Sequence, residues 1–264
     1  MPELAEVEFY RRQWDQGHGQ PVLRVHLNAK KRVLRGVSAP ALQKALTGAK
    51  LTGSEGHGKQ MLFRFSGDTW LRVHLGMTGG LSVEAADFQP GKHDHLVLFQ
   101  KQRALVFHDP RQFGRIQFHQ GAQAPDWWSN LPPQPQEAAF TRSFVEKFLA
   151  RRKKAPAKAV LLMQESFAGI GNWMADEILW RARINPKRRV ESLDPEEIAR
   201  LWKQTRWVAR ESIKHVAPAH ADLPKGWLFN ERWSKRGVCP RDGTPLKRAE
   251  VGGRTTAWCP KCQP

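Results

Sequence analysis

Residues 167–178, FAGIGNWMADEI, decide how the C-terminal half of the chain folds. Gly169 and Gly171 allow a tight turn, because glycine adopts backbone conformations that other residues rarely adopt. The helix that follows would present its N-terminal amides to a phosphate group. Asn172 is then a ligand of that phosphate, a cap of the helix, or both. The stretch predicts two helices joined by turns, at residues 159–167 and 173–181.

Upstream of this stretch, apolar and polar residues alternate in short runs. The runs at residues 61–66, 71–75, 95–99 and 104–108 have the two-residue period of β-strands. A helix is predicted before them at residues 2–14. We therefore expect a mostly antiparallel β domain of about 120 residues.

The middle of the chain breaks this alternation. Residues 120–138 are rich in proline and have few periodic apolar positions, which is typical of a linker. Helical spacing returns at residues 144–149 and 195–215. Asp194 before Pro195 forms a good N-terminal cap for the second of these helices.

The charge of the chain favours a polyanionic partner. Its 264 residues include 43 Lys and Arg against 25 Asp and Glu, a formal net charge of +18, with most of the excess after residue 138. Nucleic acid is the commonest partner of such a chain, ahead of anionic membranes; a merely solubilising surface is the alternative. With 40% hydrophobic residues the chain is not of the disordered class. No apolar run approaches the ~18 residues of a membrane span. Residues 1–8 do not resemble a secretory signal, and we expect a cytoplasmic protein.

The beginning of the chain suggests an unusual nucleophile. Removal of Met1 would leave Pro2 as a terminal secondary amine. An α-amino group titrates near pH 8, far below a lysine, so part of it is free to form a Schiff base. Glu3 could exchange protons with the same substrate. An ordinary helix start with an acidic first turn is the alternative, and it is the better one for these residues alone.

The three cysteines all lie near the C-terminus, at Cys239, Cys259 and Cys262. An odd number in a reducing compartment argues against a disulfide framework and for a metal site. The short segment from Gly237 onwards is rich in glycine and proline, as in a zinc ribbon.

Several motifs together resemble one known family. MPELAEVE at residues 1–8 is similar to the MPELPEVE start of the formamidopyrimidine-DNA glycosylase family, bacterial enzymes that excise oxidised purines. Further motifs resemble those of the family in the same order: HGK at 57–59, HLGMTG at 74–79, KHDH at 92–95, DPRQFG at 109–114, GIGN at 169–172, ADE at 175–177 and RTTAWCPKC at 254–262. The resemblance covers most of the chain.

The resemblance implies a fold of the α+β class. Its expected parts are an N-terminal antiparallel β-sandwich with an N-terminal helix, a linker, a helix–two-turns–helix domain that binds DNA, and a zinc-finger hairpin. In this chain they would occupy residues 1–120, 121–138, 139–236 and 237–264.

The resemblance also implies a catalytic set. Pro2 would attack C1′ of the damaged nucleotide, and Glu3 would protonate the opening sugar and move protons during strand cleavage. Lys59 would hold a phosphate beside the lesion and assist catalysis. Arg254, in the finger hairpin, would clamp a phosphate.

A second implied set would contact the DNA around an extruded base. Met77 would enter the gap in the stack, Phe113 would wedge beside it, and Arg111 would face the orphaned partner base. Each apolar residue could instead belong to a strand-end core.

His74, His93 and Asn172 would contact phosphates. An uncharged core histidine is the alternative for His74 and for His93. Glu177, in the ADE motif, would support the site rather than take part in the chemistry.

The metal site departs from the family pattern of two C-x2-C pairs. Its second position is Asp242, so we expect one structural Zn²⁺ held by Cys239, Asp242, Cys259 and Cys262. Asp242 is otherwise a turn residue, with water completing the zinc. Three thiolates and a carboxylate should bind more weakly than four thiolates.

The resulting expectation is a bifunctional DNA glycosylase and AP lyase. It would excise oxidised bases (formamidopyrimidine, with 8-oxoguanine as a further candidate) from double-stranded DNA, form a Schiff base through Pro2, and cleave the strand by β/δ-elimination. Damaged or abasic duplex DNA would be its partner, and the protein would act as a monomer without a membrane. The short segment 215–226 weakens the case for 8-oxoguanine, whose recognition uses a longer loop in relatives.

Three alternatives remain. The first is an oxidised-pyrimidine glycosylase like endonuclease VIII, which Met77, Arg111 and Phe113 disfavour. The second is a non-catalytic damaged-DNA-binding protein, which the intact catalytic set disfavours. The third is an RNA-binding or ribosome-associated zinc ribbon, which leaves the N-terminus unexplained.

Overall fold

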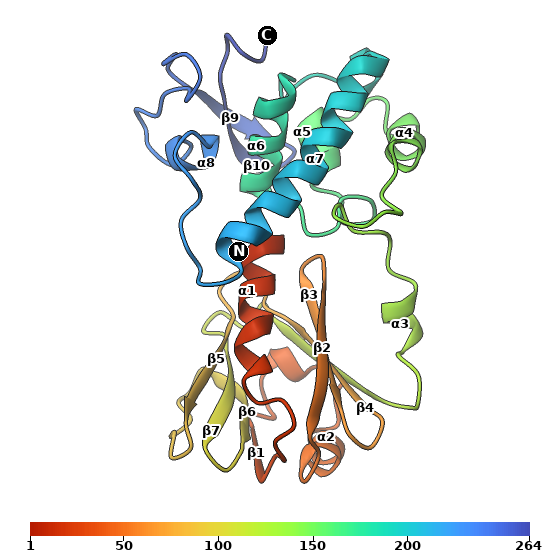
Figure 1. Ribbon diagram of the computed structural model, residues 1–264, viewed down its shortest axis with the longest axis vertical. Coiled ribbons are helices and arrows are strands. Elements are labelled where there is room, and N and C mark those ends of the chain that lie inside the picture. The colour runs from red at the N-terminus through yellow and green to blue at the C-terminus, as the bar shows by residue number, and fades with distance from the viewer. The chain divides into compact units, whose positions relative to one another are not determined.

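The computed structural model describes residues 1–264 and divides into two compact units (Figure 1). The first unit comprises residues 1–2 and 6–131, and the second comprises residues 3–5 and 132–264. None of the helices combines the length and apolarity needed to cross a lipid bilayer.

The first unit is built on two four-stranded antiparallel sheets, in the orders β1-β6-β7-β5 and β2-β3-β4-β8. Its elements are α1 (Leu4–Asp15, whose first two residues belong to the second unit), β1 (Arg24–Leu27), a short 3-10 helix η1 (Arg32–Leu34), α2 (Ala39–Leu46), β2 (Leu51–His57), β3 (Gln60–Phe65), β4 (Thr69–His74), β5 (Gly80–Ala85), β6 (Asp94–Phe99), β7 (Arg103–His108), β8 (Arg115–Gln120) and α3 (Asp126–Ser129).

One apolar core joins the two sheets of the first unit. Met61, Phe63 and Phe65 alternate along β3 and pack in the same core as Leu105 and Phe107 of the other sheet. Every second side chain of β3 points into this core, which produces the two-residue alternation seen in that part of the sequence. The antiparallel β-sandwich predicted from the sequence is therefore confirmed.

The proline-rich stretch after β8 does not begin as an extended linker. Trp128 of α3 is buried with Leu62 and Trp70 on the outer face of the second sheet. Its indole Nε1–H donates to Glu55 Oε1 at 2.9 Å. Residues up to Leu131 thus belong to the first unit, and the expected boundaries at 120 and 138 stay predictions.

The second unit is helical with one two-stranded hairpin. Its elements are α4 (Arg142–Ala150), α5 (Ala157–Leu161), α6 (Asn172–Ala182), η2 (Val190–Ser192), α7 (Pro195–Val216), α8 (Leu228–Glu231), β9 (Lys247–Val251) and β10 (Arg254–Trp258). Nine of the 11 residues of α6 are buried, so this helix forms the centre of the unit.

The start of α7 agrees with the sequence prediction, whereas the end of α5 does not. Asp194 caps α7 as predicted, and with Glu197 it forms a complete capping box. The helix expected at residues 159–167 is wrong beyond Leu161, where α5 ends. The apolar Phe167 is buried in the core without being helical, because Gln164 turns the chain by bonding the backbone of Gly169 and Ile170.

Candidate active site and nucleic-acid interface

The Glu3 carboxylate is bound to the first turn of α6. It accepts backbone N–H bonds from Gly171 at 3.0 Å, Trp173 at 3.0 Å and Met174 at 3.1 Å. These N–H groups have no partner within the helix, and the helix dipole favours an anion there. Glu3 is therefore fixed in the second unit, before α1 begins at Leu4, and does not serve as an acidic first turn of its own helix.

The two glycines of the GIGN motif have different functions. Gly169 has φ +84°, in the left-handed region that favours glycine. Gly171 has φ −121°, which any residue adopts, so the expectation that it is needed for the turn is wrong. A Cβ at residue 171 would lie 2.2 Å from Glu3 Cδ. Gly171 is required because the carboxylate occupies the space of a side chain.

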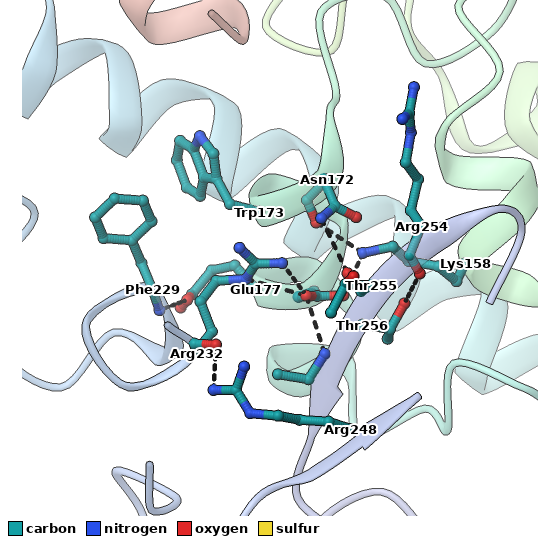
Figure 2. Close-up of polar contacts among 12 residues, drawn as sticks. Lys158, Asn172, Trp173, Glu177, Phe229, Arg232, Arg248, Arg254, Thr255 and Thr256 are labelled. Atoms are coloured by element: carbon teal, nitrogen blue, oxygen red, sulfur yellow. Dashed lines mark hydrogen bonds and ion pairs between the residues drawn. The ribbon is translucent and has the colours of Figure 1, made fainter. Parts of the chain in front are cut away.

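Asn172 joins the same helix end to the finger hairpin. Its Nδ2 donates to the backbone carbonyl of Thr255 at 2.9 Å. Arg254, the preceding residue, begins β10 and has an exposed side chain that extends away from this network (Figure 2). Glu3, Asn172 and Arg254 are therefore brought together in the second unit.

The centre of α6 carries two buried acids. Asp176 bonds Lys158 and Arg232, both of which are also buried. Glu177 accepts from Arg181 Nε at 2.7 Å and from the Phe229 backbone N–H at 3.1 Å. Burial outweighs these contacts and raises the pKa of Glu177 to about 7.

Aromatic rings lie beside the same helix end. The Trp173 and Phe229 ring centroids are 5.0 Å apart, and those of Phe229 and Trp233 are 5.9 Å apart. Trp233 is 61% exposed, which is unusual for so large an apolar side chain. This surface was not predicted, because its members are separated in sequence by about 60 residues and share no periodic pattern.

The four expected metal ligands form one cluster. Their ligand atoms lie within 4.8 Å of one another. The Cys239 and Cys262 sulfurs are 3.8 Å apart, and Asp242 Oδ2 lies 3.4 Å from Cys262 Sγ. Four ligands at 2.0–2.3 Å from a tetrahedral ion would stand about 3.4–3.8 Å apart. The cluster can therefore hold a metal ion.

Neighbouring groups donate hydrogen bonds to two of these ligands, whereas burial and the nearby Asp242 raise the pKa of the Cys262 thiol to about 12. The Thr244 N–H, 3.0 Å from Asp242 Oδ1, holds the pKa of Asp242 well below its usual range. Trp180 Nε1–H donates to Cys239 Sγ at 3.3 Å. Such hydrogen bonds to ligand atoms orient them and suit thiolates and carboxylates that face a cation.

In the first unit, the remaining expected residues gather at one end of the two sheets. Lys59 lies in the two-residue turn between β2 and β3, and Gln60 after it pairs with His74 at the end of β4. The next loop, residues 75–79, leads to β5, and the loop 109–114 leads from β7 to β8. Strand pairing thus brings together residues that are far apart in the sequence, such as Lys59 and Phe113, which are separated by 54 positions.

The loops 75–79 and 109–114 touch through their backbones. A Cβ at Gly76, which has φ +65°, would lie 2.4 Å from the carbonyl carbon of Phe113. The buried Asp109 holds both loops, since it accepts from Thr78 Oγ1 at 3.1 Å and from the Gly114 N–H at 2.7 Å.

Two apolar side chains project from these loops. Met77 is 40% exposed and Phe113 is 43% exposed, so neither belongs to a strand-end core. The Arg111 guanidinium lies 4.9 Å from the Phe113 ring centroid. An exposed thioether, an exposed ring and a cation therefore lie at one end of this unit.

The two histidines differ in environment. Burial and nearby Arg72 and Lys59 lower the pKa of His74 to about 4, and its Nδ1 accepts the Gly76 N–H at 3.0 Å. A phosphate contact by His74 would thus use a neutral Nε2–H donor. Desolvation and Lys92 lower the pKa of His93.

The comparisons with known proteins agree with this architecture. The family model for the formamidopyrimidine-DNA glycosylase N-terminal domain matches residues 1–116, and the model for the H2TH domain of the same enzymes matches residues 131–220. Formamidopyrimidine-DNA glycosylases of Pelobacter propionicus and Thermus thermophilus are 34% and 35% identical to the chain. The matches cover all of this chain and 100% and 98% of those relatives.

Solved structures of Lactococcus lactis Fpg (MutM) are also similar. One, a complex with DNA that contains an oxidised pyrimidine, has a TM-score of 0.88 at 29% identity. Another, with DNA that contains an abasic site, has a TM-score of 0.87 at 29% identity. Both matches cover 99% of each chain. By sequence and by fold, this chain belongs to the formamidopyrimidine-DNA glycosylase family.

Proposed function

We propose that the protein removes oxidised bases from double-stranded DNA and then cuts the strand at the resulting abasic site. The observation that carries the proposal is the position of Glu3. Its carboxylate is bound to the turn of α6 that also carries Asn172, whose amide holds the strand of Arg254. A proton-transfer group and two candidate phosphate ligands therefore share one helix end.

In the proposed reaction, the Pro2 nitrogen attacks C1′ of the damaged nucleotide and the bond from C1′ to the base breaks. The base leaves with a proton, the sugar ring opens as Glu3 protonates its oxygen, and the amine becomes an iminium. Loss of a C2′ proton then expels the 3′-phosphate, and a second elimination expels the 5′-phosphate. Pro2 can act in this way once Met1 has been removed.

Binding would use both units of the protein. Lys59, His74 and His93 would contact phosphates from the first unit, and Asn172 and Arg254 from the second. Phosphate contacts of this kind position a duplex without reading its sequence.

The exposed loop residues would stabilise a duplex from which one base has been extruded. Met77 and Phe113 would replace lost stacking, which accounts for apolar side chains left 40% and 43% exposed. The Arg111 guanidinium would offer hydrogen-bond donors to the unpaired partner base.

For the substrate, we propose formamidopyrimidines first and oxidised pyrimidines second. The curated relatives are named for the former, and the Lactococcus lactis structures hold DNA with N7-benzyl-Fapy-dG or an oxidised pyrimidine. Phe229 and Trp233 offer flat surfaces beside α6 on which an extruded base can stack. 8-Oxoguanine ranks below both as a candidate, because the segment 215–226 is short.

We also propose that the cluster of three cysteines and Asp242 holds one structural Zn²⁺. Thiolate-rich sets with tetrahedral spacing favour zinc, and the +2 charge suits three thiolates and a carboxylate. The ion would fix the base of the β9–β10 hairpin, from which Arg254 projects.

Cleavage of a panel of labelled duplexes tests the proposal. Each duplex carries one formamidopyrimidine, dihydrouracil, 8-oxoguanine or abasic site, and an undamaged duplex is the control. We expect cleavage of the abasic duplex and at least one damaged duplex. Binding without cleavage of any duplex would instead indicate a damage-binding protein without catalysis.

A further inference from the structure

The buried carboxylate of Asp176 connects three separate elements to α6. Oδ1 accepts from Lys158 Nζ of α5, and Oδ2 accepts from Arg232 Nη2 at 2.6 Å and Nε at 3.1 Å. Oδ2 also accepts the backbone N–H of Ala257 in β10 at 3.2 Å. A single side chain thus holds α5, the segment after α8 and the finger hairpin.

Asp176 and Asn172 bind the same strand in matching register. They are four residues apart on α6, a rise of about 6 Å. Their partners Thr255 and Ala257 are two residues apart on β10, about 6.6 Å along an extended strand. The two contacts therefore fix both the position and the direction of β10, and with them the starting point of Arg254.

The hairpin tip is fixed by close packing as well. Gly252 has φ +62°, and a Cβ there would lie 2.9 Å from the Ala159 Cβ of α5. The candidate metal ligands flank the opposite end of the hairpin, before β9 and after β10. The contacts that place the tip thus involve none of the metal ligands.

We propose that Asp176, with Arg232, positions Arg254 for phosphate binding independently of the metal site. The inference rests on the proposed phosphate role of Arg254. Asp176 touches no DNA in this account and acts as a positioning residue. A metal ion would hold the base of the hairpin, whereas the Asp176 contact to Ala257 fixes the direction in which β10 runs relative to α6.

The charges around Asp176 explain why its loss would move the strand. Lys158, Asp176 and Arg232 are 0–3% exposed, so two cations share one anion without bulk water. Removing the anion leaves Arg232 without its carboxylate partner and leaves Lys158 with the Asn172 carbonyl as acceptor, so we expect the segments that carry these two cations to shift. One of these segments contacts β9 directly, because Arg248 donates to the Arg232 carbonyl.

The test compares Asp176→Asn and Arg232→Gln with a matched control. Arg188→Gln also removes one positive charge and one ion pair from the same unit, and the Arg188 side chain bonds Ser192 and Glu197. Affinity is measured for a duplex with a tetrahydrofuran abasic analogue over a range of salt concentrations. Metal content, melting temperature and the single-turnover rate at saturating DNA are measured alongside.

We expect Asp176→Asn and Arg232→Gln to keep wild-type metal content and to bind the duplex at least tenfold more weakly. The logarithm of the association constant decreases linearly with the logarithm of the salt concentration. The steepness of this decrease should be smaller by about 0.9, the value for one lost phosphate contact. The rate at saturating DNA should stay close to wild type, because a correctly bound duplex still reaches Glu3. Arg188→Gln should keep an affinity and a salt dependence close to those of the wild type.

A double-mutant cycle with Arg254→Ala decides whether Asp176 acts through Arg254. We expect Asp176→Asn to have little further effect once Arg254 is gone. Full additivity of the two substitutions, or loss of metal from Asp176→Asn or Arg232→Gln, would overturn the inference. If Asp176→Asn does not fold, the same cycle with Arg232→Gln decides. If Arg254→Ala itself leaves affinity unchanged, the proposed phosphate role of Arg254 fails instead.

Discussion

Glu3 and Gly171, 168 positions apart in the chain, are in direct contact. The Glu3 carboxylate accepts the Gly171 N–H at 3.0 Å, and a Cβ on Gly171 would lie 2.2 Å from Glu3 Cδ. The glycine therefore makes room for the acid, and the acid satisfies the start of α6. Residues 3–5 and the GIGN motif therefore belong to one structural unit.

Gly171→Ala is predicted to displace Glu3. The new methyl group overlaps the carboxylate, and overpacking of this kind costs about 1–3 kcal/mol. The melting temperature should fall, and cleavage of an abasic duplex should fall at least tenfold. Gly53→Ala is the matched control, since a Cβ there would meet nothing within 4 Å. Wild-type cleavage by Gly171→Ala would show that the position of Glu3 does not matter for the reaction.

Arg111→Ala is predicted to weaken discrimination by the base opposite the lesion. The guanidinium lies beside the exposed Phe113 ring, where it can donate to a base edge. Cleavage rates are compared for one lesion opposite each of the four bases, and the spread between them should shrink. Arg24→Ala, which removes an arginine from the start of β1, serves as the charge control. An unchanged spread with Arg111→Ala would contradict the assigned role.

Asp242 variants test the metal site. Asp242→Cys should bind zinc more tightly than the wild type and resist a chelator longer, because a thiolate replaces a carboxylate. Asp242→Ala should lose zinc sooner. Zinc release to a colorimetric chelator measures both, with metal content determined beforehand. Equal release from all three proteins would mean that Asp242 is only a turn residue.

Glu177 gives a pH-dependent prediction. Its pKa is raised to about 7 in the folded protein and lies near 4.5 when unfolded. The folded state therefore binds the proton more tightly, so this group's contribution to stability falls as pH rises from about 4.5 to about 7. The loss is roughly 3 kcal/mol at most, at about 1.4 kcal/mol per pKa unit.

Glu177→Gln should remove this loss, since glutamine cannot ionise. The free energy of unfolding of wild type, relative to Glu177→Gln, should decrease across that pH range. Denaturant unfolding at several pH values measures it, with the exposed Glu165→Gln as a control expected to keep the wild-type slope. A wild type that gains stability over Glu177→Gln as pH rises would show that the ion pair with Arg181 outweighs burial.

Local patterns in the sequence predicted much of the fold. The alternation of Met61, Phe63 and Phe65 identified a strand with one face in the core, and Asp194 identified the start of α7. Both features depend on residues that are close together in the sequence, so tertiary packing does not change them. The helix predicted to reach Phe167 was too long, because burial in the core can produce helical spacing without a helix.

The candidate site was predictable residue by residue only through motifs. Neither Glu3 nor Asp176 has a local signal for its partners, which come from α6 and β10 respectively. An acid four residues after Asn172, on the same helix face, was the one available hint for Asp176. Contacts across such distances are set by packing, which sequence periodicity does not record.

The most direct test of the central claim is identification of the residue that bonds to DNA. The protein is incubated with an abasic duplex and borohydride, which reduces the iminium to a stable adduct, and the adduct is mapped by mass spectrometry. We predict an adduct on Pro2 in a chain that lacks Met1, and its loss when that terminal amine is acetylated, with duplex binding retained. An adduct on Lys59 or any other lysine, with Pro2 unmodified, would contradict the account.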